Sequence, residues 1–180
     1  AGCTALSEIK EHKNLKNVAA DAFTGTAWEN AKEDGALSFG RVLYSYKGNL
    51  SEIVIPKGVS IVEDYAFLGN ENLKKVVFGD DVEEIGLYAF QNCVNLKTVE
   101  FDDAMGIVSA GAFKGCSSLT AADFSETTLA AIGYEAFSGC TSLAEVKLSE
   151  TLSDIGDYAF ADTKIATLEF FKNVNAINAT

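Results

Sequence analysis

Four cysteines carry the most reactive side chains of this chain: Cys3, Cys93, Cys116 and Cys140. Thiolates bind zinc or form disulfides, and the spacing between cysteines distinguishes the two chemistries. The last three are 23 and 24 residues apart, and no two cysteines form a Cys-x-x-Cys pair. The only histidine, His12, has no second histidine to join it. The spacing therefore predicts no metal site, and we expect no cofactor.

Carboxylates are the second group with potential chemistry, since stacked carboxylates can collect calcium. The acidic residues in question recur at similar places along the chain: Asp80, Asp81, Asp102, Asp103, Glu126 and Glu150. No Asp-x-Asp-x-Asp-Gly sequence, which is typical of a calcium-binding loop, accompanies them. We therefore interpret these residues as solvated turns, with a calcium site as the alternative.

Catalytic motifs are missing from the sequence. It contains no Gly-x-Ser-x-Gly, His-Glu-x-x-His or Gly-x-x-x-x-Gly-Lys pattern. A single histidine also excludes any mechanism that needs two. Paired carboxylates are abundant, but without a cleft to perturb their pKa values they do not indicate an active site. We expect no catalytic residues and no enzyme activity.

The composition is that of one globular domain with a core, because 48% of the 180 residues are hydrophobic and 22% are charged. The formal net charge of −12 repels phosphate backbones, which argues against a nucleic-acid partner. No apolar run approaches the roughly 20 residues needed to cross a bilayer, and the N-terminus lacks the layout of a signal peptide. We expect no membrane insertion by this segment.

An internal repeat organises the chain. The dipeptide Ala-Phe recurs with its phenylalanine at positions 23, 67, 90, 113, 137 and 160. Each unit opens with a leucine, at positions 6, 50, 73, 96, 119 and 143, and a partial unit begins near residue 165. The unit that opens at Leu119 contains one extra residue. Periods of this length indicate a solenoid, because one short unit cannot bury its apolar side without neighbours.

Within one unit, three short elements follow each other. Apolar residues at Leu73, Val76 and Phe78 alternate as in a short strand that has one face in the core. Val82 and Ile85 fit a short extended piece on the far side, and the segment 88–90 (Tyr-Ala-Phe) fits a single helical turn. Stacked units then form a continuous parallel sheet.

The pattern Leu-x-x-Val-x-Phe, Val-x-x-Ile-Gly, Tyr-Ala-Phe-x-x-Cys resembles the BspA-like leucine-rich repeat, and the segment 55–59 (Ile-Pro-Lys-Gly-Val) is close to that family's usual strand exit. The resemblance implies a right-handed solenoid of about 23-residue units, with a parallel sheet on one face and short strands, turns and single helical turns on the other. Family members occur mostly in bacterial cell-surface and secreted proteins, and they are described as adhesins or interaction modules. The resemblance therefore implies such a location for this chain.

We expect residues 1–180 to form one solenoid, with an irregular insert at 24–49. Alternating apolar residues around Gly40-Arg41 predict a β-hairpin there. The hairpin either packs to keep the solenoid continuous or forms a ligand-binding bulge, whose candidate residues are Trp28, Arg41, Tyr44 and Tyr46. Neither end shows a unit with a polar outer face, so we expect a fragment of a longer array.

The cysteines gain a structural interpretation from the repeat. Cys93, Cys116 and Cys140 stack in one slot of adjacent units, which predicts a column of small buried thiols. A disulfide is the alternative, but parallel Cα–Cβ vectors fit that bond poorly. Cys3 occupies the same slot of the first unit, and a lipidated Cys3 after Ala1-Gly2 is the competing interpretation.

The exposed face of the strands is the remaining candidate for function, since it holds six acids and three bases. Its candidate partner-binding residues are Glu8, Lys10, Glu52, Lys75, Thr98, Glu100, Asp123, Glu145, Lys147 and Glu169. Such a face can bind a basic extracellular or host protein by charge complementarity. The alternative is a passive spacer that holds another domain of the parent protein away from the cell surface. We expect a monomer in either case.

Overall fold

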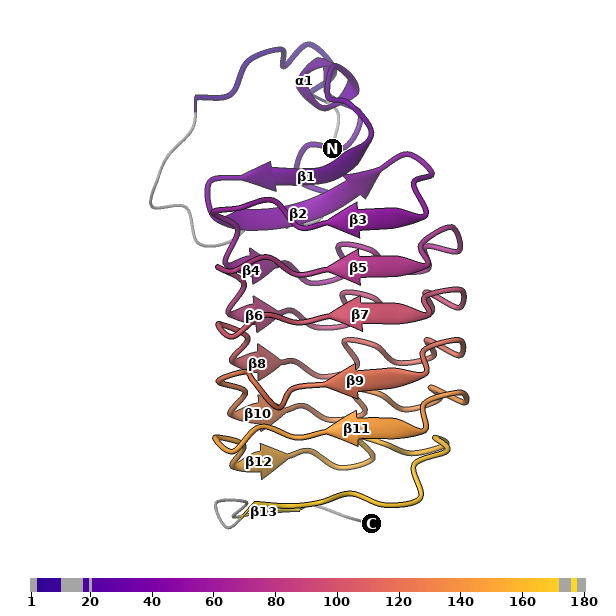
Figure 1. The fold of residues 1–180 in the computed structure, drawn as a ribbon. Helices are drawn as coiled ribbons and strands as arrows, with labels where there is room; N and C mark the ends of the chain where they lie inside the picture. The colour runs from indigo at the N-terminus through magenta and orange to yellow at the C-terminus, as the bar shows by residue number, and fades with distance from the viewer. Residues whose placement is uncertain (1–2, 11–17, 20, 172–175, 178–180) are drawn as a thin grey trace.

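The computed structural model describes residues 3–10, 18–19, 21–171 and 176–177. Within these ranges the chain coils as a solenoid whose units stack along one axis (Figure 1). Each regular coil contributes one strand to the front, one strand to the back and a turn that leads to the next coil. No helix in the described ranges is long and apolar enough to cross a membrane.

Five three-residue strands form the front face. They are β3 (Glu52–Val54), β5 (Lys75–Val77), β7 (Thr98–Glu100), β9 (Ala121–Asp123) and β11 (Glu145–Lys147). Neighbours pair in parallel as two sheets, β3-β5-β7 and β9-β11. The outer two side chains of each strand face solvent. The middle side chain is buried, as the apolar alternation predicts; the buried residues are Ile53, Val76, Val99, Ala122 and Val146.

An eight-stranded sheet forms the back. Its order is β1-β2-β4-β6-β8-β10-β12-β13, and from β2 onward every pair is parallel. The strands are β1 (Gly35–Phe39), β2 (Val42–Lys47), β4 (Ile61–Val62), β6 (Glu84–Ile85), β8 (Ile107–Val108), β10 (Ala131–Ile132), β12 (Asp154–Ile155) and β13 (Ala176–Ile177). Of the short extended piece expected at Val82 and Ile85, Ile85 lies in β6 and Val82 just before this strand, and both side chains are buried.

The return to the next coil is a column of turns rather than of single helical turns. In the segment 63–70, hydrogen bonds link Ala66 N to Glu63 O (3.3 Å) and Leu68 N to Tyr65 O (3.0 Å). Tyr65 has a φ of 60°, and the same slot holds Gly111 with a φ of 63°. This left-handed conformation is incompatible with a right-handed helical turn. It directs alternate N–H groups toward the neighbouring coil.

Aromatic rings and thiols fill the core beside the turns. Phe90, Phe113 and Phe137 stack with ring centroids 5.2 Å apart, nearly parallel. The three buried cysteines are free, and each donates its S–H to the carbonyl of a phenylalanine of the preceding coil, as Cys116 Sγ does to Phe90 O at 3.1 Å. The predicted column of buried thiols is confirmed, and no disulfide joins its members.

The insert forms a hairpin at the N-terminal end of the solenoid. Strands β1 and β2 pair antiparallel around Gly40-Arg41, and β2 pairs in parallel with β4, so the back sheet continues into the insert. Before the hairpin lies the short helix α1 (Ala27–Asn30), which Thr26 caps by accepting a hydrogen bond from Glu29 N. A second apolar cluster holds the hairpin against the first coil through Val18, Leu37, Phe39, Val42 and Tyr44.

Candidate protein interface

Side chains on the front face align in rows across the strands. Glu52, Lys75 and Thr98 are in register across β3, β5 and β7, and Asp123 is in register with Lys147 across β9 and β11. Because parallel in-register strands are about 4.8 Å apart, residues of one row can contact each other. Strand pairing therefore brings the charged side chains of these strands into rows.

The lysines of this face are paired with carboxylates. Lys75 Nζ lies 2.6 Å from Glu100 Oε1, and Lys147 Nζ lies 2.7 Å from Asp123 Oδ2 and 3.9 Å from Glu145 Oε1. Hydrogen bonds to the carboxylates raise the pKa of both lysines. Partial burial opposes ionisation of Asp123, but hydrogen bonds from Lys147 and Ser125 bring the pKa of this carboxyl below its usual value.

The front face is interrupted between β7 and β9. No backbone hydrogen bond links these two strands in the described chain, although Phe101 and Phe124 stack beneath them with centroids 4.3 Å apart. A hollow of about 290 Å³ opens at the interruption. Its lining consists of Val99, Glu100, Phe101, Asp123, Ser125, Glu126 and Thr127. The hollow therefore carries three carboxylates in the middle of the face.

The first and last candidate residues do not belong to the front strands. Glu8 and Lys10 are exposed, but their segment forms no strand, because the chain just before them bonds to the insert instead: Trp28 N donates to Leu6 O at 2.7 Å. Glu169 is also exposed, on a segment without strand structure. The structure brings together the candidates from Glu52 to Lys147.

Most candidate residues of the insert pack inside it. Tyr44 is fully buried, and burial raises the pKa of its hydroxyl strongly, with a smaller contribution from Glu29. Trp28 is partly buried, in contact with the rings of Phe23 and Tyr44. Arg41 is exposed and forms an ion pair with Glu83 at 3.0 Å. The side chains support the interpretation of a packed hairpin.

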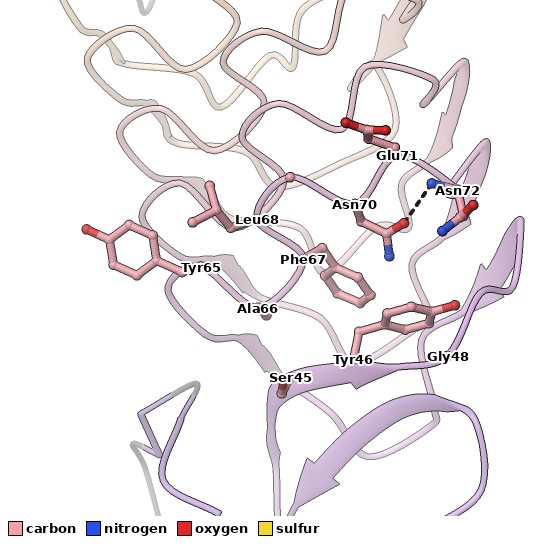
Figure 2. Close-up of a pocket in the computed structure, with 11 residues that line it drawn as sticks. Ser45, Tyr46, Gly48, Tyr65, Ala66, Phe67, Leu68, Asn70, Glu71 and Asn72 are labelled. Carbon is pink, nitrogen blue, oxygen red and sulfur yellow. Dashed lines mark hydrogen bonds between the residues drawn. The ribbon is translucent and has the colours of Figure 1, made fainter. Parts of the chain in front are cut away.

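A larger hollow lies where the insert meets the first regular turn. It measures about 520 Å³, and Tyr46 of β2 lines one side while residues 65–72 line the other (Figure 2). The Tyr46 ring lies 5.5 Å from that of Phe67, and its hydroxyl hydrogen-bonds to the backbone of Leu50. In Figure 2 the side chain of Asn70 accepts a hydrogen bond from Asn72 N.

The thiols and carboxylates assemble no metal site in the described part of the chain, where no group of three potential ligands is close enough to hold an ion. Burial raises the pKa of Cys93 and Cys140 to about 12, and it raises that of Cys116 as well. Such thiols are un-ionised at neutral pH and poor ligands. His12 lies outside the described residues.

The sequence analysis named Glu100, Asp123 and Tyr46 as candidates, but it missed both hollows and the other residues that line them. For each hollow, the repeat pattern of the sequence contains an irregularity that marks its position. The hollow between β7 and β9 is lined by Ser125, Glu126 and Thr127, which belong to the one unit with an extra residue. The hollow beside Tyr46 lies where the insert at 24–49 replaces a regular unit and its Ala-Phe turn.

The fold is that of a leucine-rich-repeat solenoid. Its coils stack with parallel front and back strands, and a leucine lies at the entry of each front strand. The family model described as "BspA type Leucine rich repeat region" matches six copies, over residues 1–86, 37–137 and 61–180. The chain belongs to the BspA-type leucine-rich-repeat family. A search among curated proteins finds no match.

Solved structures of bacterial proteins share the fold. A leucine-rich repeat protein of T. pallidum is 30% identical with a TM-score of 0.68, covering 74% of this chain and 66% of that one. A leucine-rich repeat protein of Eubacterium ventriosum is 24% identical with a TM-score of 0.58 (74% and 43% covered). The pneumococcal vaccine antigen PcpA is 19% identical with a TM-score of 0.54 (76% and 37% covered). The match thus spans less than two thirds of each of these relatives.

Proposed function

We propose that this chain is a non-enzymatic protein-interaction module that binds a basic extracellular or host protein through its acidic front face. The observation that carries the proposal is the interruption between β7 and β9, which places the carboxylates of Glu100, Asp123 and Glu126 around one hollow. Glu126, together with the carboxylates that Glu100 and Asp123 share with Lys75 and Lys147, favours a lysine or arginine side chain of a partner there. Adhesion is the biological role that the family resemblance suggests.

Two further features support the proposal. Lys75 and Lys147 are held by neighbouring carboxylates, so their positive charges are already compensated within the face. Five carboxylates on the face and in its hollow outnumber these two lysines, so the face keeps a net negative charge: Glu52, Glu100, Asp123, Glu126 and Glu145. Complementary potentials of this kind raise association rates and specificity, and salt weakens them.

The test is binding of the purified chain to an array of extracellular and host proteins at low and high salt. A triple variant reverses Glu100, Asp123 and Glu145 to lysine. We expect saturable, salt-sensitive binding to basic partners and at least roughly tenfold weaker binding of the variant, since each lost charge contact contributes on the order of 1 kcal/mol.

A control with the same change of net charge reverses Asp21, Glu33 and Asp154, which are exposed and lie away from the front face. Retained binding of this control and loss with the front-face variant would support the proposal. Equal binding by both variants would exclude the front face as the interface. Absence of any binding partner would favour the spacer role.

We also propose a cell-surface or secreted location. Its support is the family membership together with the general occurrence of BspA-like repeats in such proteins. Protease accessibility of the protein on intact cells would test it, because a protein inside the cell is protected until lysis.

A further inference from the structure

Backbone hydrogen bonds link successive members of the turn column, always in the same direction. Three N–H groups on alternate residues of each turn donate to three carbonyls of the next turn. Between the first two turns, the donors at positions 65, 67 and 69 bond to the carbonyls of Leu87, Ala89 and Gln91, with distances of 3.0, 2.8 and 2.7 Å. Three more junctions repeat this pattern with donors at positions 88, 90 and 92, then 111, 113 and 115, then 135, 137 and 139.

The first turn of the column has unmatched acceptors. One repeat before Leu87, Ala89 and Gln91, the corresponding carbonyls belong to Asp64, Ala66 and Leu68. No donor among the described residues bonds to them, because the insert supplies β2 but no turn at this level. Backbone carbonyls in folded proteins are nearly always paired with protein or water. Within the described part of the chain, these three carbonyls therefore form a hydrogen-bonding edge without a protein donor.

The insert replaces the missing turn only in part. Elsewhere in the column each phenylalanine ring stacks on the ring of the next coil, as Phe67 does on Phe90 with centroids 4.7 Å apart. Tyr46 of β2 supplies an aromatic ring on the open side of Phe67. Phe67 thus has an aromatic neighbour on this side, but the described residues supply no N–H donors in place of the missing turn. The hollow of about 520 Å³ lies between Tyr46 and the first turn (Figure 2).

We propose that this hollow is a peptide-docking site, distinct from the front face, that completes the turn column with a loop of a partner protein. The loop adopts the turn conformation of the repeat and donates three alternate backbone N–H groups to the carbonyls of Asp64, Ala66 and Leu68. It needs small side chains, since Tyr46 already fills the aromatic position. Glu71 in the lining and the net charge of −12 favour a basic loop. Backbone pairing with an exposed edge is an established mode of peptide recognition.

The test uses the capped heptapeptide Gly-Tyr-Lys-Ala-Ala-Ser-Gly, which copies residues 133–139 with Glu135→Lys and Phe137→Ala. Its third, fifth and seventh amides correspond to the donors of the turn column. Titration into the ¹³C,¹⁵N-labelled chain, followed by NMR, should shift the carbonyl ¹³C signals of Ala66 and Leu68, with a Kd on the order of 1 mM. N-methylation of the fifth residue should weaken binding about tenfold, because it removes one facing donor.

The matched control peptide is N-methylated at the second residue, which corresponds to Tyr134, whose N–H bonds to no carbonyl in the described chain. It should bind as the unmodified peptide does. Equal binding of both methylated peptides, or shifts confined to the side chains of Glu71 and Asn72, would show that charge rather than backbone pairing attracts the peptide. Carbonyl shifts that appear without peptide as the protein concentration rises would identify a second copy as the occupant and overturn the proposal.

Discussion

Replacing Phe113 by alanine should cost more stability than the same change in any ring at the end of the column. Phe113 is fully buried, stacks on Phe90 and Phe137 with both centroids 5.2 Å away, and contacts the edge of Phe101 at 6.1 Å. Phenylalanine-to-alanine changes in well-packed cores cost about 3–5 kcal/mol. With neighbours on both sides that cannot collapse into the cavity, we expect about 4 kcal/mol for Phe113→Ala.

Phe160→Ala is the matched comparison. Phe160 occupies the same slot in the last regular coil, is partly exposed, and stacks on Phe137 at 5.6 Å. We expect roughly half the cost, about 2 kcal/mol, because less area is buried. Urea unfolding followed by circular dichroism measures both free energies of unfolding. Equal costs, or a loss below about 1 kcal/mol for Phe113→Ala, would refute the idea that two-sided stacking stabilises the centre of the solenoid.

Two further predictions concern titrating groups. In the native chain at pH 8, a thiol reagent should modify only the exposed Cys3 quickly, since burial raises the pKa of Cys93, Cys116 and Cys140. All four cysteines should react in guanidinium. A second thiol that reacts quickly in the native chain would contradict the buried column. Glu63→Gln should stabilise the chain at pH 7 but not at pH 4. Burial raises the pKa of Glu63 above its ordinary 4.5, Asp64 and Glu84 add to this, and the backbone N–H of Val18 opposes it. The folded state thus binds the proton more tightly than the unfolded state, and stability is lost as pH rises from 4.5 through the raised pKa. Thermal unfolding at both pH values checks this, with exposed Glu71→Gln as the control, and an equal gain at pH 4 would contradict the assignment to the carboxyl group.

The regular coils follow from local patterns in the sequence. Apolar side chains at Leu73, Val76 and Phe78 alternate because only one face of a three-residue strand meets the core, and all three are buried. Repetition then fixes what lies beside each residue, so the buried cysteine column and the rows of charges on the front face could be predicted without a structure. Gly40 and Arg41 marked the hairpin for the same local reason.

Features that depend on pairing between distant segments could not be predicted in this way. Glu8 was expected on the front face by register, but the described residues of its coil bond to the insert, through Trp28 N to Leu6 O, and none of them bonds to β3. The turns were expected to be helical, yet Tyr65 adopts a positive φ that lets its N–H reach Leu87 O in the next coil. The hollow between β7 and β9 could not be predicted, because the sequence does not show that these two neighbouring strands form no backbone hydrogen bonds.

That same interruption has a mechanical consequence. Hydrogen bonds between coils run along the solenoid axis, so a pulling force on its two ends would load the junctions in series and open the weakest one first. The junction between the coils of β7 and β9 retains the β8-β10 pairing and the bonds of the turn column, but has no backbone bonds at the front. Each released coil of 23 residues would lengthen the chain by roughly 75 Å, from about 4.8 Å of stacked rise to about 80 Å of extended chain. Under tension, this junction would therefore open first among those that join coils with a front strand.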